Sequence, residues 1–230
     1  MNTFGQRVLD FNSRLEYKGK LPKGINLMNP FKNNKRILDI TKKFYNKFYN
    51  DNNERFLILG INPGRFGAGV TGLPFTDTKR LNNECGIEFI DFVSHEPSSV
   101  FVYEVIKAYG GVEKFYSKFY ITSLCPLGFT IKKETGREVN YNYYDSRELT
   151  DAVYDFIVDS TKKQIKIGVS REVCYCFGTG KNAKFLTELN EKEKFFSKIV
   201  PLEHPRFIVQ YRLKKMKQYV DKYLDLLNNN

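Results

Sequence analysis

The sequence predicts an α/β fold, a three-layer α/β/α sandwich around a central, mostly parallel four-stranded sheet. Two observations favour it. Four short apolar runs are typical of strands, and helical patterns fill the stretches between them. Strands that alternate with helices form parallel sheets covered on both faces. Because no repeat or linker divides the chain, we expect one domain over residues 1–230, with residues 55–227 as its core and residues 1–50 as flanking helices.

The predicted strands are Arg55–Leu59, Phe119–Leu124, Val173–Phe177 and Lys198–Leu202. Apolar residues three and four positions apart predict helices over Ile37–Tyr49, Val100–Tyr109, a long stretch from Asp145 or Ser146 to near Gly168, Lys181–Leu189, and Arg212–Leu227. The second of these helices has Ser98 and Ser99 as N-cap candidates and Gly110-Gly111 as its stop.

The chain is strongly basic, with a net charge of +11 from 37 Lys and Arg against 26 Asp and Glu. Ten basic residues lie between Arg14 and Lys47, and a second basic group lies near the C-terminus. An excess of this size favours a polyanionic partner, nucleic acid above all, although a solvated lysine-rich surface is the alternative interpretation.

No apolar run reaches the roughly 18 residues that span a bilayer, and the N-terminus lacks the apolar centre of a signal peptide. We therefore expect a cytoplasmic protein that does not use a membrane. The four cysteines include no C-x-x-C pair, and the chain has two histidines. Neither a metal site nor a disulfide is expected, and Cys174 and Cys176 are expected to pack in the core.

The first predicted strand ends in Gly60-Ile61-Asn62-Pro63-Gly64. Pro63 fixes its own φ and favours an extended Asn62, so the carboxamide is held on a stiff turn. Ligands of open α/β sheets bind at the carboxyl ends of the strands, which makes Asn62 a candidate site residue. An ordinary strand-ending turn is the alternative interpretation, because Asn-Pro and Pro-Gly are common turn pairs.

Polar residues also follow the other predicted strands. Ser123 precedes Leu-Cys-Pro, His204 precedes Pro205, and Gly178-Thr179-Gly180-Lys181 begins a helix. If the strands are parallel, these ends meet at one edge, and Asn62, Ser123 and His204 surround one cleft.

With these motifs in place, the chain resembles the uracil-DNA glycosylase superfamily, specifically the single-strand-selective monofunctional enzymes and their bacterial relatives. The family's Gly-Met-Asn-Pro-Gly, Phe-Gly and Thr-Gly-x-Pro-Phe, its central Asn-Leu-Cys-Pro-Leu and its final His-Pro correspond to Gly60–Gly64, Phe66-Gly67, Thr71–Phe75, Ser123–Leu127 and His204-Pro205. The order and the gaps agree over residues 55–227.

The resemblance implies a monofunctional DNA glycosylase of base-excision repair that flips a damaged nucleotide into a pocket and hydrolyses its N-glycosidic bond. Asn62 would position the attacking water, and His204 would stabilise the departing base. The base would be held by a set of residues that includes a stacking phenylalanine: Gly60, Ile61, Pro63, Gly64, Phe66, Phe75 and Ser123. Taken singly, His204 also suits a helix cap, and Phe75 suits the core.

Gly64 stands where related branches have a bulky tyrosine, so substituted uracils are expected to fit. Ser123 replaces the family's base-reading asparagine, and a hydroxyl offers fewer hydrogen bonds than an amide. We therefore hypothesise relaxed or shifted base choice, extending to hypoxanthine or xanthine.

The predicted DNA contacts are Ser98, Ser99, Gly180 and Lys181 at helix starts, and Arg206, Phe207 and Arg212 after the final motif. Each helix-start residue is equally explained as a cap or a surface residue. The stretch after His204 departs from the family's Ser-Pro-Arg-Asn wedge.

No metal or cofactor is expected. The protein is expected to be a monomer. Lyase activity is not expected either, because Lys181 is the one amine among the matched motifs and lies at the rim. Two alternative functions stay open, a non-catalytic nucleic-acid-binding relative and an α/β enzyme acting on free nucleosides.

Overall fold

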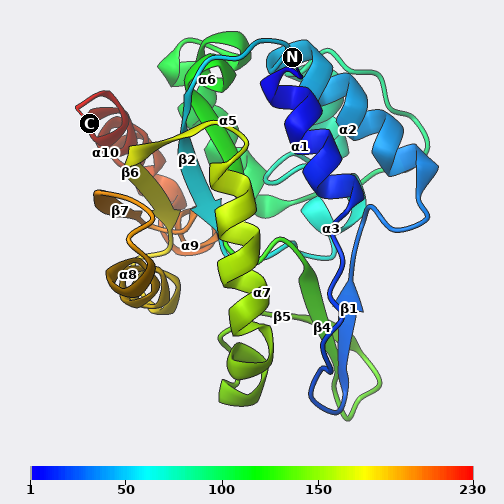
Figure 1. Ribbon diagram of the computed structural model, residues 1–230. Helices are drawn as coiled ribbons and strands as arrows, with labels where there is room; N and C mark the ends of the chain where they lie inside the picture. The colour runs from blue at the N-terminus through cyan, green and yellow to red at the C-terminus, as the bar shows by residue number, and fades with distance from the viewer. Residues whose placement is uncertain (1, 230) are drawn as a thin grey trace.

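A four-stranded parallel sheet forms the centre of the computed structural model, which describes residues 2–229 (Figure 1). Strand β2 (Arg55–Gly60) lies between β3 (Phe119–Ser123) and β6 (Val169–Phe177), and β7 (Lys198–Leu202) pairs with the far side of β6. All three pairings are parallel, so the four carboxyl ends meet at one edge. The predicted fold class and its four strands are confirmed.

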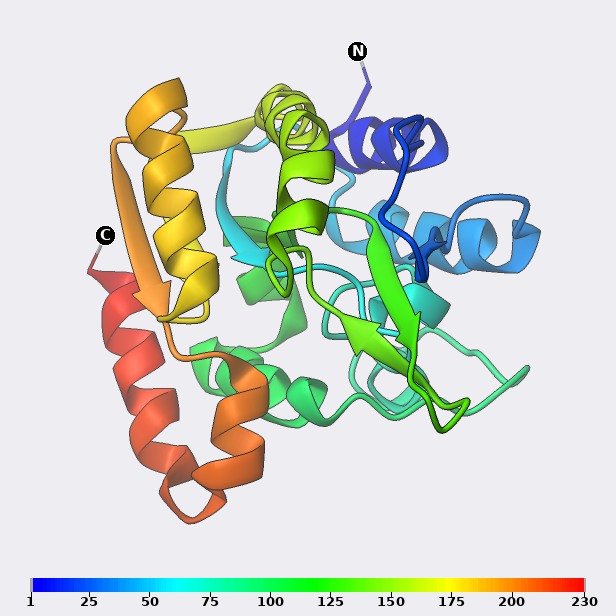
Figure 2. The same cartoon turned by 90° about the horizontal axis from the view of Figure 1, so that it is seen from below.

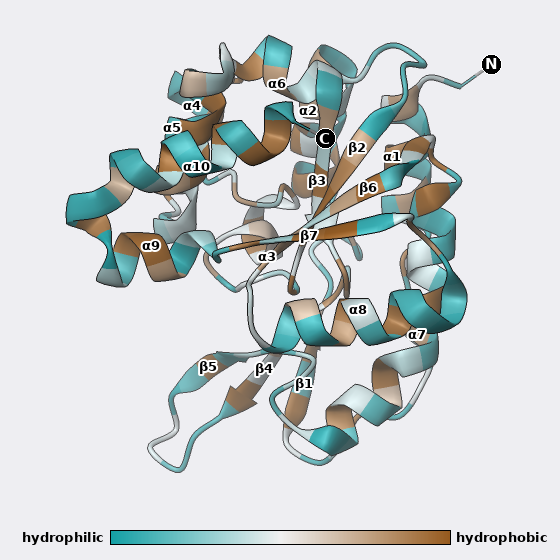
Figure 3. Ribbon diagram, turned by 90° about the vertical axis from the view of Figure 1, so that its left-hand side faces the viewer, coloured by the Kyte–Doolittle hydropathy of each residue, from teal (hydrophilic) through white to brown (hydrophobic). Residues whose placement is uncertain are grey.

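Helices cover both faces of this sheet. In Figure 3, α5, α9 and α10 lie on one side of the strands, and α1, α7 and α8 lie on the other. The helices are α1 (Phe4–Ser13), α2 (Lys35–Phe48), α3 (Ala68–Thr71), α4 (Thr78–Asn83), α5 (Pro97–Tyr109), α6 (Val112–Lys118), α7 (Arg147–Ile165), α8 (Lys181–Glu193), α9 (Pro205–Tyr211), the 3-10 turn η1 (Leu213–Lys215) and α10 (Met216–Asn228).

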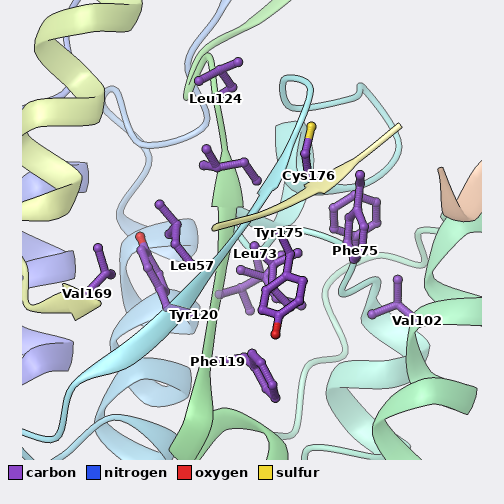
Figure 4. Packing of buried hydrophobic residues seen from close by; sticks show 14 of the residues in the cluster. Leu57, Leu73, Phe75, Val102, Phe119, Tyr120, Leu124, Val169, Tyr175 and Cys176 are labelled. Atoms are coloured by element: carbon purple, nitrogen blue, oxygen red, sulfur yellow. The ribbon is translucent and has the colours of Figure 1, made fainter. Parts of the chain in front are cut away.

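Successive apolar side chains of the central strands point to opposite faces of the sheet, so they form part of the core on each face. Leu57, Ile58 and Leu59 are at most 1% exposed. Figure 4 shows Leu57 and Tyr120 on one side of the strands, and Phe119 and Phe75 on the other. Helices cover the core on both faces of the sheet, so the polar residues that follow the strands lie at the carboxyl edge.

Two helix starts differ from the sequence-based expectation. Helix α5 has Glu96 as its N-cap and Pro97 in its first turn, so Ser98 and Ser99 lie inside the helix. Proline favours this position because its fixed φ is helical and its missing N–H leaves no unpaired donor. The predicted helix over Arg212–Leu227 instead begins at Met216, after α9 and η1. Ser146 caps α7 as expected, accepting from the Leu149 N–H.

The N-terminal helices pack on the sheet through aromatic rings and one buried arginine. The Arg55 side chain is completely buried, and its guanidinium lies 4.7 Å from the ring centroids of Phe4 and Tyr49. It donates hydrogen bonds to both Asp51 carboxylate oxygens and to the Tyr116 carbonyl. Arg55 thereby ties the start of β2 to α1, α2 and α6.

We expect Arg55→Ala to lower the free energy of unfolding by about 3–5 kcal/mol, because it leaves buried acceptors unpaired and opens a cavity. Urea denaturation followed by circular dichroism measures the change. Arg14→Ala is the matched control, since Arg14 pairs with Asp10 at the surface and such a pair contributes about 1 kcal/mol or less. Equal losses in the two variants would contradict this account of Arg55.

A second sheet, not predicted from the sequence, consists of three antiparallel strands in the order β1-β4-β5. These strands are β1 (Ile25–Met28), β4 (Gly128–Lys132) and β5 (Glu138–Tyr141). The β4–β5 hairpin projects from the body of the protein (Figure 2). Four residues separate the end of β3 from the start of β4, so the small sheet stands beside the carboxyl edge of the large one.

All four cysteines are buried as free thiols, with Cys174 and Cys176 fully enclosed on β6, as their spacing predicts. Within residues 2–229, no helix combines the length and the apolar character needed to cross a membrane.

Candidate active site

Asn62 lies on the turn that follows β2, at the carboxyl edge of the parallel sheet. Backbone hydrogen bonds tie this turn to the end of β3. The Leu124 N–H donates to the Gly60 carbonyl at 2.9 Å, and the Cys125 N–H donates to the Ile61 carbonyl at 3.1 Å. The turn that carries Asn62 is therefore an extension of the sheet rather than a mobile loop.

The small sheet fixes the Asn62 carboxamide. Its Oδ1 accepts from the Tyr143 N–H at 3.1 Å, and its Nδ2 donates to the Tyr141 carbonyl at 3.3 Å. A carbonyl oxygen has two lone pairs, so one lone pair of Oδ1 is left for a further donor. The carboxamide is oriented but retains the capacity to hold a water molecule.

Tyr143 is itself anchored deep in the protein. Its fully buried hydroxyl donates to Asn182 Oδ1 at 2.7 Å, and Asn182 Nδ2 donates to the Phe177 carbonyl at 3.0 Å. A chain of hydrogen bonds thus runs from the end of β6, through the start of α8, to the segment that holds Asn62.

His204 is the N-cap of α9 and lies two residues after the end of β7. Its Nδ1 accepts from the Arg206 N–H at 3.1 Å. Burial, with a smaller contribution from the nearby Arg206 charge, lowers the pKa of His204 to about 4. At neutral pH the imidazole is therefore uncharged, and its single proton is on Nε2. His204 is a neutral hydrogen-bond donor.

The Phe75 ring packs against the sheet (Figure 4) and lies next to His204. It meets Phe177 edge-on at 5.0 Å between centroids and lies 6.0 Å from the imidazole. Phe75 has a φ of +56°, in the left-handed region that non-glycine residues rarely adopt. A strained backbone held in place by packing is often found where a side chain is aimed for function.

Gly60 leaves the space that Phe75 occupies, because a Cβ at Gly60 would lie 3.1 Å from the ring. We expect Gly60→Ala to displace the ring and lower the free energy of unfolding by about 1–3 kcal/mol through overpacking. Chemical denaturation measures the loss. Gly180→Ala is the matched control, since a Cβ there has no atom within 4 Å. A Gly60→Ala variant as stable as this control would contradict the packing argument.

Asn62, Ser123 and His204 line one cavity of about 370 Å³, together with Phe75. Ile61, Pro63 and Gly64 line it too, as do Ser98 and Arg206. The predicted meeting of three strand ends therefore occurs. A larger hollow of about 460 Å³ lies between α1 and α7 and is lined by none of the predicted site residues.

Several predicted residues lie elsewhere. Phe66 is 53% exposed and outside the cavity, with the Arg65 guanidinium 4.5 Å from its ring centroid, so the prediction that it lines the base pocket is wrong. Ser99 is completely buried, with its hydroxyl 3.0 Å from Asp77 Oδ2. It cannot contact a phosphate, because the turn of α5 directs it inward while Ser98 faces the cavity.

The remaining predicted contacts are exposed around the site. Phe207 and Arg212 belong to α9 and its end, and their side chains stack at 5.2 Å. Gly180 and Lys181 start α8 and lie outside the cavity, with the Lys181 ammonium 5.9 Å from the Tyr144 ring.

Five cavity residues were not predicted as site residues, namely Ala68, Pro74, Glu96, Asn140 and Asn142. Asn140 Oδ1 accepts from the Arg65 N–H at 3.0 Å, which joins the small sheet to the Asn62 turn. Two asparagines flanking a tyrosine carry no strand periodicity. The one signal in the sequence was the turn-forming Gly136 shortly before them.

Comparison with known proteins gives the family of the chain and a closely similar structure. A family model described as the uracil DNA glycosylase superfamily matches residues 46–228. The chain is similar to the crystal structure of wild-type Pedobacter heparinus SMUG2, with 54% sequence identity, a TM-score of 0.96 and 100% of both chains covered. No curated protein matches the chain. The shared fold includes all the strand ends that form the cavity.

Proposed function

The chain belongs to the uracil DNA glycosylase superfamily, and from this premise we propose that it is a monofunctional glycosylase that hydrolyses the N-glycosidic bond of uracil or a related deaminated base in DNA. One observation carries the proposal. Asn62, Ser123 and His204 come from three different strand ends, yet line a single cavity with Phe75. The cavity of about 370 Å³ is lined by residues able to bind a base, hold a water and stabilise an anion.

In this reaction, Asn62 acts on the sugar side of the N-glycosidic bond and His204 acts on the base side. A water held by Asn62 Oδ1 attacks C1′ of the flipped nucleotide as the C1′–N bond breaks, and the bonding electron pair leaves with the base. His204 donates its Nε2–H hydrogen bond to the base, where negative charge grows. The water loses a proton to solvent, and the base takes one up to leave neutral.

Phe75 would stack on the flipped base, an interaction that contributes about 1–3 kcal/mol and suits many bases. Gly64 lines the cavity without a side chain, which leaves room for a substituent on the base. Ser123 offers a hydroxyl in place of an amide, so recognition of the base edge is less selective. These features support a substrate range wider than uracil, including substituted uracils and deaminated purines.

The DNA itself would be held outside the cavity by two stacked pairs of aromatic and basic side chains. Arg65 and Phe66 form one stacked pair, and Phe207 and Arg212 form another. Exposed aromatic rings bind unpaired bases, and guanidinium groups bind phosphates. We assign Phe66 to a base next to the flipped one rather than to the flipped base. Ser98, Gly180, Lys181 and Arg206 are the further phosphate contacts that we propose.

A panel of labelled oligonucleotides tests the function. Each carries uracil, hydroxymethyluracil, hypoxanthine, xanthine or thymine, in single or double strands, and abasic sites are cleaved with alkali. We expect cleavage for uracil and at least one other base, and none when alkali is omitted. Cleavage without alkali would contradict monofunctional hydrolysis. Activity on free nucleosides, with no steep dependence on salt, would favour the nucleoside-processing alternative.

A further inference from the structure

Glu96 is the one acidic residue among the described residues that line the cavity holding Asn62 and His204. Its Oε2 atom is enclosed and has no hydrogen-bond partner within residues 2–229. Buried polar atoms are nearly always paired, since leaving one unpaired costs about 1–3 kcal/mol. An unpaired carboxyl oxygen at the wall of a binding cavity indicates that a ligand supplies the missing partner.

The segment around Glu96 is rigid. Its backbone N–H donates to Asp77 Oδ2 at 3.1 Å, and its carbonyl accepts from the Ser99 N–H at 2.9 Å. The carboxyl group packs directly on Gly67, where a Cβ would lie 2.4 Å from the carboxyl carbon. Packing, rather than a hydrogen bond, therefore places the carboxyl group, and its enclosed Oε2 is left without a protein partner within residues 2–229.

The surroundings favour the neutral form of this acid. Burial, and after it the Asp77 charge, raises the pKa of Glu96 to about 8, although Arg206 acts in the opposite direction. The charged and titratable groups around it come from two places. One group is Asp77 with its partners Arg80 and His95, and the other is His204 and Arg206 at the start of α9. At neutral pH the carboxyl group carries its proton, so it offers one O–H donor and one C=O acceptor.

We infer that Glu96, as a neutral carboxylic acid, is a base-reading residue that donates one hydrogen bond to the flipped base and accepts another from it. The inference rests on the proposed function. Uracil and the deaminated purines present a carbonyl acceptor beside an N–H donor, and a neutral carboxyl group matches that pair as a carboxamide does. Ser123 by itself offers the base edge one hydroxyl group. An ionised carboxylate would instead repel the anionic base as the bond breaks.

Single-turnover excision between pH 5.5 and 9.5 tests this role, with uracil-containing single-stranded DNA. We expect the wild-type rate to fall at least tenfold above pH 8, as Glu96 ionises. Glu96→Gln mimics the neutral acid, so it should lose the alkaline fall and have a rate at pH 7 well above that of Glu96→Ala. Because both proteins act on the same DNA, ionisation of the base itself cancels in the comparison. Glu96→Ala should lose tenfold or more at every pH.

Glu104→Gln is the matched control, because Glu104 is an exposed glutamate of the same helix, and it should keep the wild-type rate and pH profile. Gly67→Ala gives an independent variant that moves the carboxyl group without removing it, and its rate should fall at pH 7. Melting temperatures show that each variant is folded.

A Glu96→Gln rate as low as that of Glu96→Ala, or the same alkaline fall in Glu96→Gln as in the wild type, would overturn the inference while leaving glycosylase activity established. A wild-type protein that excises no base at any pH would remove the proposed function, and the inference with it.

Discussion

Replacing Asn62 by alanine should lower the single-turnover rate of uracil excision by about a thousandfold, within the range of about 10²–10⁴ that a positioned proton-transfer or water-holding group contributes. The carboxamide is held from two sides, by the Tyr143 N–H and the Tyr141 carbonyl. These bonds use part of its capacity and leave a lone pair of Oδ1 for the water. Alanine removes the carboxamide that, in the proposed mechanism, orients the nucleophile.

DNA binding should be nearly unchanged in the same variant, because the role that we propose for Asn62 is to hold water and not to bind phosphates. Fluorescence anisotropy with a labelled oligonucleotide measures binding, and quenched single-turnover assays measure excision. Asn83→Ala is the control, since Asn83 is exposed on α4 and remote from the cavity lining. An Asn62→Ala rate within tenfold of the wild type would contradict the assigned role.

The double variant Asn62→Ala with His204→Ala separates an enzyme from a non-catalytic DNA-binding relative. If the protein only binds DNA, no excision is present for the double change to remove. If it is a glycosylase, excision disappears while affinity and its dependence on salt persist. The combined loss should be smaller than the product of the two single losses, since both groups act on one transition state.

The parallel sheet could be predicted because its strands contain short apolar runs that alternate with helical patterns, and polar residues follow the carboxyl ends of these runs. Asn62, Ser123 and His204 follow three such runs, so the topology of a parallel sheet brings them together. The small antiparallel sheet lacked such a signal. Ile25–Met28 has four residues, and Glu138–Tyr141 is half polar. Tertiary pairing with β4, rather than local preference, makes them strands.

Adjacent serines show a second limit of sequence reasoning. Ser98 and Ser99 carry the same local signal, yet one lines the cavity and the other hydrogen-bonds Asp77 in the interior. The difference depends on where α5 begins, which Pro97 and the bond from Glu96 to Asp77 determine. Glu96 itself looks like a loop residue in the sequence, because nothing local shows that its carboxyl group is enclosed.

Replacing His204 by alanine should lower the excision rate by about 10²–10³-fold, the effect of removing one preorganised donor to a developing anion. The structure fixes which ring nitrogen carries the proton, since Nδ1 accepts from the Arg206 N–H and the proton of the neutral ring is therefore on Nε2. His95→Ala is the matched control, because His95 is the other histidine of the chain and its side chain is 64% exposed.

The pH profile tests whether the donor is neutral. A pKa of about 4 keeps His204 uncharged throughout pH 5 to 7, so the wild-type rate should be level across that window. A charged imidazolium donor with an ordinary pKa near 6.5 would instead make the rate rise as the pH falls through 6.5. A rate that rises in this way in the wild type, and not in His204→Ala, would contradict the neutral assignment.

The leaving base supplies the sharpest test of His204. If the imidazole stabilises charge on the departing base, its removal matters most when the base is a poor anion. We therefore expect His204→Ala to lose less on 5-fluorouracil, whose anion the fluorine stabilises, than on uracil. Asn62→Ala should lose about equally on both, because the water attacks the same sugar carbon in each. Single-turnover rates for the two variants on the two bases give this comparison directly. Equal losses of His204→Ala on both bases would place its contribution in binding rather than in bond cleavage.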